Sequence, residues 1–264
     1  MSVNADRYAE CIDDLDTHPK LRFDPANPWW QKHFAMMRAA KEALGGDYRV
    51  NIPDLIENLD IYAAMRGPQT SLYDLMDQPE KLMARVNEID ETYFEYYDRL
   101  HELLKEDDGT SSYTAFHILG VGRVAKVQCD FSAMLSPAQF RAFAIPSLRR
   151  QVERLDHSLY HLDGPDAIRH VEALMEIERL DALQWTCGAG QPDGGNPRWF
   201  GIYDQVRAAR KGLWVHLYDG DVRQWIKSAE VLLNRYGMER LYLIFPPMPM
   251  DDAEALLAHA QRNW

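Results

Sequence analysis

The chain has 264 residues, of which 46% are hydrophobic and 27% are charged, and its formal net charge is −12. This balance is typical of a globular protein and excludes a disordered chain. The acidic charge argues against nucleic acid as a partner, because the basic cluster Arg149, Arg150 and Arg154 is most simply one solvated helix face.

Cysteine usage and the first residues indicate a cytoplasmic protein. Cys11, Cys129 and Cys187 lie far apart and form no CxxC pair, so neither a disulfide framework nor a zinc ribbon is expected. Residues 1–14 are polar and acidic, unlike a signal peptide. No apolar run approaches the ~20 residues that cross a bilayer. We therefore expect a soluble protein without membrane contact.

The first residues predict one helix that packs on the remainder of the chain. The segment "FDPANPWW" precedes a helical run from Gln31 to Leu44, and the two glycines at 45–46 are a C-cap signal. The tryptophan pair at 29–30 could be a ligand platform, but such pairs more often seal a core edge. We predict a helical segment over residues 1–47 that packs on a domain formed by residues 48–264.

A helix-rich block comes next. Residues 48–55 have strand character, and apolar residues from Pro79 onward recur at helical spacing. The acidic segment "ENLDIYAAM" (57–65) and the charged helix 88–106 are most simply solvated faces. The segment "DDGTSS" (107–112) is predicted to be a loop.

From residue 122 onward, strands alternate strictly with helices. The predicted strands are 122–130, 158–164, 181–187, 211–217 and 240–245, and the predicted helices are 135–155, 165–177, 197–210, 221–236 and 250–262. Continuous apolar strands in this alternation indicate a parallel sheet covered by helices. About six strand–helix units can be counted, two fewer than the eight of a closed (β/α)₈ barrel.

Polar residues gather where the predicted strands end, which is where parallel α/β proteins place their sites. These residues are Asp130, His161, Asp163, Gln184, Trp185, Cys187 and His216. His161 and Asp163 are two residues apart, so both would point to one face of a strand. The pair could hold a metal, transfer a proton, or only fix a loop.

Each candidate has a structural alternative. Asp163 could cap the helix that begins at Pro165, with His161 filling a polar layer of the core. Cys187 could be a small buried hydrophobe, and His216 a hydrogen-bonded interior residue.

The remaining candidates lie in loops. Asp130 could contact a substrate or cap the loop that follows it. The glycine-rich segment 187–200, "CGAGQPDGGNPRWF", lacks the spacing of nucleotide-binding loops. We interpret it as a mobile loop in which Trp199 covers a pocket.

Three stretches of the chain resemble consecutive blocks of the uroporphyrinogen decarboxylase superfamily, which comprises TIM-barrel decarboxylases and corrinoid-dependent methyltransferases. They read "IPDLIENLDIYAAMRGPQTSLYDLMDQPEKLMARV", "VQCDFSAMLSPAQFRAFAIPSLRRQVERL" and "YHLDGPDAIRHVEALMEIERLDALQW". The resemblance runs from about residue 48 to the C-terminus and implies an α/β, TIM-barrel-like (β/α)₈ fold. Only ~47 residues precede the block that resembles the third unit, so the first strand–helix units are expected to be missing. N-terminal helices or a second copy in a homodimer would cover the exposed edge.

The chain departs from both branches of that superfamily. The decarboxylases carry an Arg-rich segment and a key aspartate in the missing units. They also have a Gly-His-Gly near the last strand, where residues 245–248 here read Phe-Pro-Pro-Met. Porphyrinogen decarboxylation is therefore disfavoured. The methyltransferases use a His-x-Cys motif and a later cysteine to bind zinc. His161 matches the histidine, Asp163 stands in the first cysteine position, and the later cysteine is missing, although aspartate is itself a zinc ligand.

The resemblance thus implies a metal-assisted methyltransferase of the corrinoid and thiol type. His161 and Asp163, with Cys187 or His216, would bind zinc, while Asp130, Gln184, Trp185 and Trp199 are expected to contact a small-molecule substrate. A separate protein would carry the corrinoid, because the chain has no corrinoid-binding motif. Acid–base chemistry without a metal is a variant. The alternative is a catalytically degenerate barrel that binds a ligand or a partner, and a decarboxylase with other residues is the least favoured.

Overall fold

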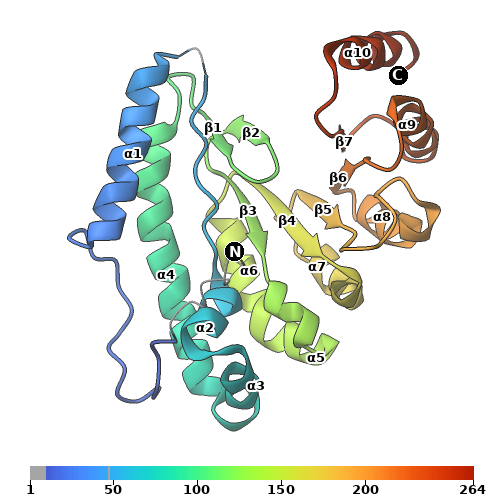
Figure 1. Ribbon diagram of the computed structural model, residues 1–264. Helices are drawn as coiled ribbons and strands as arrows, with labels where there is room; N and C mark the ends of the chain where they lie inside the picture. The colour runs from blue at the N-terminus through green and yellow to red at the C-terminus, as the bar shows by residue number, and fades with distance from the viewer. Residues whose placement is uncertain (1–9, 47) are drawn as a thin grey trace, which may run out of the picture. The chain divides into compact units, whose positions relative to one another are not determined.

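The structure is a computed structural model that describes residues 10–46 and 48–264. The chain divides into two compact units, residues 1–158 and 159–264 (Figure 1). The predicted N-terminal helix and the first part of the predicted barrel domain therefore belong to the same unit. No helix in the described ranges combines the length and the apolar content that a membrane span requires.

The first helix, α1 (Pro28–Leu44), begins three residues before the predicted start. The side chain of Asn27 accepts hydrogen bonds from the backbone N–H groups of Trp29 and Trp30, and the helix ends at Gly45 in the left-handed conformation. Helix α1 runs along α4 (Pro79–Leu104), and the Trp30 ring packs edge-on against Tyr96 of α4. Trp29 is exposed, so one of the two tryptophans seals the helix contact.

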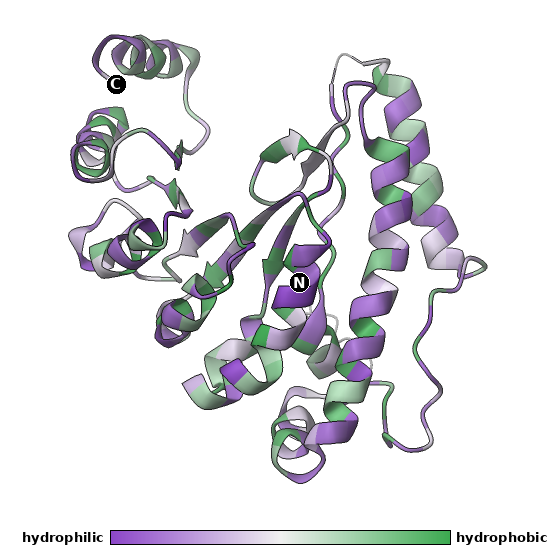
Figure 2. Cartoon of the chain, turned by 180° about the vertical axis from the view of Figure 1, so that it is seen from behind, coloured by the Kyte–Doolittle hydropathy of each residue, from purple (hydrophilic) through white to green (hydrophobic). Residues whose placement is uncertain are grey.

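Two shorter helices, α2 (Asn58–Arg66) and α3 (Pro68–Asp77), pack with α4. Helix α4 buries Leu82, Val86 and Tyr93 on one face, and its charged residues Arg85 and Asp90 are buried as well. The interpretation of helix 88–106 as a solvated face is therefore wrong at Asp90. Figure 2 shows the two colours mixed along α1 and α4, as expected for amphipathic helices. The predicted strand over residues 48–55 is wrong, because only Ile52 forms an isolated bridge, with Tyr113.

Three strands follow α4. Strands β1 (Thr110–Tyr113) and β2 (Ile118–Val121) form an antiparallel hairpin, so the predicted loop 107–112 is partly strand. Strand β3 (Val124–Gln128) lies inside the predicted strand and is buried along its whole length.

The predicted helix 135–155 is divided by a π-helical turn. A 3₁₀ turn, η1 (Asp130–Met134), leads to α5 (Pro137–Gln139), the π turn η2 (Phe140–Ala144) and α6 (Ile145–Glu153). Ser136 opens α5 with a capping box. The backbone N–H of Ile145 bonds to the carbonyl of Phe140, five residues back, just before Pro146, which has no N–H to continue the ladder.

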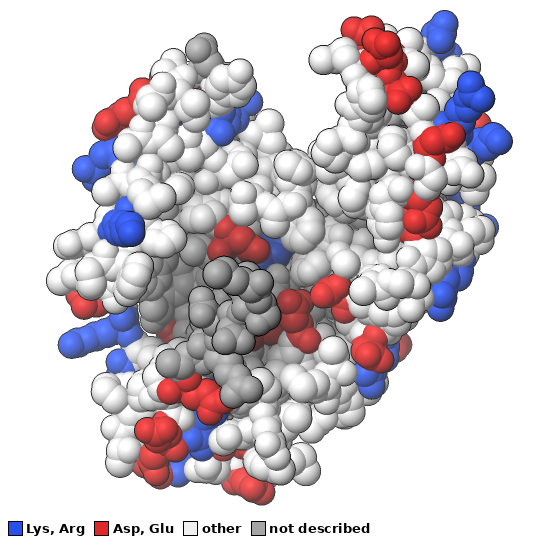
Figure 3. Space-filling model, viewed as in Figure 1, with Lys and Arg blue, Asp and Glu red and all other residues white. Residues whose placement is uncertain are grey.

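The alternation of strands and helices predicted for the second half is confirmed. Strands β4 (His157–Asp163), β5 (Ala182–Thr186), β6 (Gly212–His216) and β7 (Leu241–Ile244) pair in parallel and in chain order. The segments between and after them are η3 (Pro165–His170), α7 (Val171–Met175), η4 (Pro197–Trp199), α8 (Phe200–Ala208), α9 (Val222–Tyr236) and α10 (Met250–Asn263). Acidic and basic side chains are interspersed over α9 and α10 (Figure 3).

The register divides the residues of this sheet between two faces. One face carries two rows of side chains that run across the strands. The first row is formed by His161, Gln184, Trp214 and Tyr242. The second row, two residues further along each strand, is formed by Asp163, Thr186, His216 and Ile244. The opposite face carries apolar residues such as Leu162, Trp185 and Val215, all buried. In the described part of the chain, β7 pairs only with β6 and the strands do not close into a barrel. The structure thus confirms a mixed α/β fold with a parallel sheet, which is coarser than the predicted barrel.

Candidate functional site

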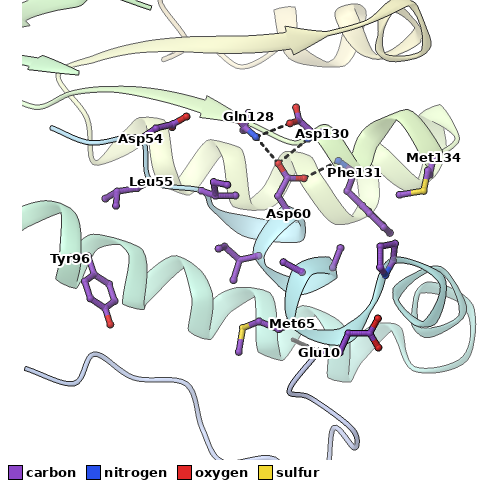
Figure 4. Close-up of a pocket in the computed structure, with 15 residues that line it drawn as sticks. Glu10, Asp54, Leu55, Asp60, Met65, Tyr96, Gln128, Asp130, Phe131 and Met134 are labelled. Atoms are coloured by element: carbon purple, nitrogen blue, oxygen red, sulfur yellow. Dashed lines mark hydrogen bonds between the residues drawn. The ribbon is translucent and has the colours of Figure 1, made fainter. Parts of the chain in front are cut away.

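A cavity of about 1360 Å³ lies within the first unit (Figure 4). Its walls are mainly apolar and include Leu55, Ile61, Phe131 and Met134. The charged residues that line it are all acidic: Glu10, Asp54, Asp60 and Asp130. The cavity therefore combines an apolar interior with several carboxylates, a combination typical of small-molecule sites.

Asp60 organises one wall of this cavity. From the first turn of α2, its carboxylate accepts the backbone N–H of Phe131 at 2.8 Å and that of Asp130 at 2.9 Å. The side-chain amide of Gln128 donates to Asp60 at 3.0 Å and to the Asp130 carboxylate at 3.0 Å. These contacts fix the loop after β3 and place Asp130, a predicted substrate contact, at the cavity wall.

A buried charged network lies behind that wall. Lys126 is fully buried, and its ammonium group lies 2.8 Å from Asp54, donates to Gln128 Oε1 at 2.6 Å and lies 3.8 Å from Glu57 Oε2. Lys126 and Gln128 are two residues apart on β3, so their side chains share one face. Glu57 accepts the backbone N–H of Gln128 at 2.6 Å. Burial raises the pKa of Glu57 well above its usual value, and the charge of Lys126 opposes that shift.

The interpretation of residues 57–65 as a solvated face is wrong, since Glu57 and Asn58 are fully buried. The missed signal is the three-residue spacing of Asp54, Glu57 and Asp60 together with a lysine inside an otherwise apolar strand. A buried lysine requires partners of opposite charge, and these three carboxylates, of which only Asp60 lies within α2, are close together in one segment.

Asn58 connects the start of α2 to the end of β3. Its backbone is in the left-handed region, with φ of 45°, a conformation that asparagine tolerates better than most residues. Its side-chain amide donates to the backbone carbonyl of Gln128 at 2.7 Å. Glu57 therefore holds the backbone N–H of Gln128, and Asn58 holds its backbone carbonyl.

The second unit presents the predicted metal residues on one sheet face. His161 Nδ1 is hydrogen-bonded to the side-chain oxygen of Gln184, whose amide nitrogen donates to Thr186 Oγ1 at 2.9 Å. Because a carboxamide oxygen only accepts, this contact places the proton on Nδ1 and the lone pair on Nε2. Asp163 is exposed at the end of β4. It does not cap the next helical segment, whose N-cap is Gly164 without a side-chain hydrogen bond.

His216 and Cys187 are placed differently. His216 lies in the row of Asp163, but Thr186 on β5 stands between them, a separation of two strand spacings or ~10 Å. Burial lowers the pKa of His216 below 6.5. Burial raises the pKa of Cys187 to about 12, and its thiol is hydrogen-bonded by Tyr218. Within the described residues, neither Cys187 nor His216 joins a metal-ligating group with His161 and Asp163.

Trp185 and Trp199 are both buried, with their ring centroids 5.0 Å apart. Trp185 follows Gln184, so it points to the opposite face of the sheet from His161. The indole N–H of Trp199 donates to the carbonyl of Asp193 at 3.0 Å. A substrate contact for either tryptophan stays a prediction, and packing accounts for both positions.

The glycine-rich loop before α8 is tied to the segment that follows β6. The carboxylate of Asp193 accepts backbone N–H groups from Gly195, Tyr218 and Asp219 at 2.8 to 2.9 Å. The N–H of Asp193 in turn donates to the side chain of Asp219. These bonds give the predicted mobile loop a defined set of anchors.

No protein-family model matches the chain, and no curated protein matches it. Among solved structures, it is similar to a methyltransferase from Methanosarcina mazei, with 13% identity and a TM-score of 0.64. The match covers 96% of this chain and 70% of that chain. At this level of identity the likeness shows the fold alone. The chain therefore shares its α/β architecture with a methyltransferase, and membership of the uroporphyrinogen decarboxylase superfamily stays a prediction.

Proposed function

We propose that the chain is a methyltransferase-like enzyme in which His161 and Asp163 hold a divalent metal ion, with zinc as the first candidate. The observation that supports this most directly is the hydrogen bond from His161 Nδ1 to Gln184, because histidines that bind metals through one nitrogen usually donate the other N–H to an oxygen. The fold shared with a methyltransferase supports the reaction class.

The residues fit a metal that keeps open coordination positions. A histidine nitrogen and a carboxylate oxygen are both zinc ligands, and a catalytic zinc site leaves room for water or substrate. A carboxylate in place of a thiolate favours harder ions than a cysteine-rich site would. When bound, the ion would act as a Lewis acid that lowers the pKa of a thiol or water acceptor.

The protein's own residues would orient and deprotonate that acceptor. Gln184, anchored on Thr186, keeps the His161 proton on Nδ1. His216 is neutral near pH 7 because burial lowers its pKa, so its ring could take up the proton that the thiol or water loses. The methyl group would come from a corrinoid on a separate protein. The cavity of the first unit would bind a small molecule, with Asp130 and Gln128 at its wall.

Elemental analysis of untagged protein after incubation with zinc tests the metal. We expect about one zinc ion per chain, lost in His161→Ala and Asp163→Ala and kept in His33→Ala, which replaces an exposed histidine of α1. Zinc-loaded protein should then demethylate methylcobalamin in the presence of a thiol, followed by the change in its visible absorbance. A parent protein that stays metal-free at saturating zinc would overturn the proposal.

A second candidate is a ligand-binding protein without turnover. The placement of Cys187 favours it, because this cysteine does not join His161 and its raised pKa disfavours the thiolate that zinc requires. The site then holds fewer protein ligands than the resemblance implied. Ligand binding without loss of methyl groups from methylcobalamin would support this second function.

A further inference from the structure

We propose that the cavity of the first unit binds an uncharged ligand with an extended apolar chain, such as a long-chain alcohol (Figure 4). The ligand class rests on the proposed function, which places a small molecule in this cavity, and it requires neither a bound metal nor methyl transfer. Nine of the 15 lining residues have apolar side chains. The greater part of the wall can therefore contact a ligand only through apolar surface.

Part of this apolar wall is open to solvent. Ile56 and Met134 both line the cavity, yet they are 42% and 49% exposed. Apolar surface in contact with water is unfavourable in proportion to its area, and large exposed apolar side chains that lie together often mark a binding site. A ligand chain that covers these two residues removes that surface from water. Met65, a third lining residue, has a flexible side chain that can adapt to the shape of the chain.

The protein itself engages three of the four carboxylates of the wall. Asp54 lies 2.8 Å from the ammonium group of Lys126. Both carboxylate oxygens of Asp60 accept backbone N–H groups, and Asp130 accepts the side-chain amide of Gln128 at 3.0 Å. The fourth, Glu10, is exposed to water. These contacts account for the acidic residues without a charged ligand.

The same carboxylates disfavour an anionic ligand. No lysine or arginine stands among the described residues that line the cavity. The ammonium group of Lys126 is fully buried and is already engaged by Asp54 and by Gln128 Oε1 at 2.6 Å. A carboxylate head group would lose its water and meet like charges instead of a cation. The lining thus favours a neutral ligand over an anion with the same chain.

Isothermal titration calorimetry on the full chain, without added metal, tests both features with three probes. Each additional buried methylene group should tighten binding about fourfold, so 1-octanol should bind about 15-fold more tightly than 1-hexanol. Octanoate has the same number of carbons as 1-octanol but is an anion at pH 7. We expect octanoate to bind at least about tenfold more weakly than 1-octanol, because like charges face it.

Substitutions place the ligand in the cavity. Ala64 lines the cavity from α2, so Ala64→Phe should occupy part of the space and weaken 1-octanol binding at least about tenfold. Ala43→Phe, at an exposed position of α1 outside the cavity, is the matched control and should leave binding unchanged. Glu10→Gln removes one exposed lining charge and should strengthen octanoate binding severalfold, whereas Glu80→Gln, exposed on α4 outside the cavity, should not.

Three results would overturn the proposal. Binding of octanoate as tight as that of 1-octanol would refute the ligand class while keeping a small molecule in the cavity. Binding of none of the three probes would refute the assignment of the cavity itself. Equal losses in Ala64→Phe and Ala43→Phe would place the ligand elsewhere. Met134→Asp, which puts a charge at an exposed position of the apolar wall, should also weaken 1-octanol binding and replaces Ala64→Phe if circular dichroism shows that variant unfolded.

Discussion

Replacing Lys126 by methionine should destabilise the first unit strongly and in a pH-dependent way. Lys126 and Glu57 are both fully buried, with their charged groups 3.8 Å apart. At an effective dielectric constant of about 20, two unit charges at that separation attract by ~4 kcal/mol. Removing one member of a buried pair leaves the other uncompensated, which typically costs ~3–5 kcal/mol. Glu57 can limit that loss by taking up a proton, so we expect a loss of about 3 kcal/mol at pH 8.

The pH dependence follows from the raised pKa of Glu57. A carboxyl whose pKa is higher in the folded than in the unfolded state makes folding take up a proton. Its stabilising contribution is full below the unfolded pKa and is lost as the pH rises through the folded pKa. Without Lys126 the folded pKa rises further, so Lys126→Met should be least destabilised near pH 5 and most destabilised near pH 8.

Chemical denaturation followed by circular dichroism at pH 5 and pH 8 measures both effects. Lys81→Met is the matched control, because Lys81 pairs with Asp16 at the surface and such pairs contribute at most ~1 kcal/mol. The double variant Lys126→Met with Glu57→Gln should lose most of the pH dependence. A loss no larger than that of Lys81→Met, equal at both pH values, would refute the view of Lys126 as the compensating charge of a buried network.

Three further outcomes are expected. Gln184→Leu removes the acceptor of the His161 N–H and should weaken zinc binding ~10–100-fold in a chelator competition, and unchanged affinity would contradict the assigned tautomer. Burial raises the pKa of Cys187 to about 12, so iodoacetamide should alkylate Cys187 far more slowly at pH 8 than the exposed Cys11. Peptide mass spectrometry measures both rates, and similar rates would contradict the burial of Cys187. Asp60→Asn leaves one backbone N–H of the loop after β3 without its carboxylate oxygen. The free energy of unfolding, measured by chemical denaturation, should fall by about 1–2 kcal/mol. A change near zero would show that other contacts hold the loop.

The architecture of the second unit could be predicted from the sequence because its signals are local. Each buried strand is a short apolar run, and each helix has a cap or an amphipathic repeat within about fifteen residues. The capping box at Asp221, for example, opens α9 where the sequence places a helix start. The π turn before Pro146 was not predicted, although a proline inside a helical pattern is the signal for such an interruption.

The lysine within an apolar strand indicates that carboxylates must meet it, but the pairing in the buried network of the first unit could not be predicted, because the burial of a charge depends on partners distant in sequence. The segment around Glu57 looks like a solvated helix face until Lys126 and Gln128 are placed against it. Residues 48–55 have strand character in the sequence, yet within the described chain their strand pairing is limited to the bridge between Ile52 and Tyr113. His161 and Gln184 were both selected as strand-end residues, but only the strand register shows that they are neighbours.

The contacts of Gln128 with Glu57 and Asn58 have a consequence for the order of folding. They join residues 70 and 71 positions apart in the chain, whereas α4 and the β1–β2 hairpin are built from contacts between near neighbours. Contacts across long chain separations form slowly, because the loop must close before they contribute any stability. We expect the helix and the hairpin to form early, with Lys126 and Glu57 still hydrated. The two charges would lose their water only when the unit has otherwise assembled, so a substitution at either should speed unfolding and leave the folding rate nearly unchanged.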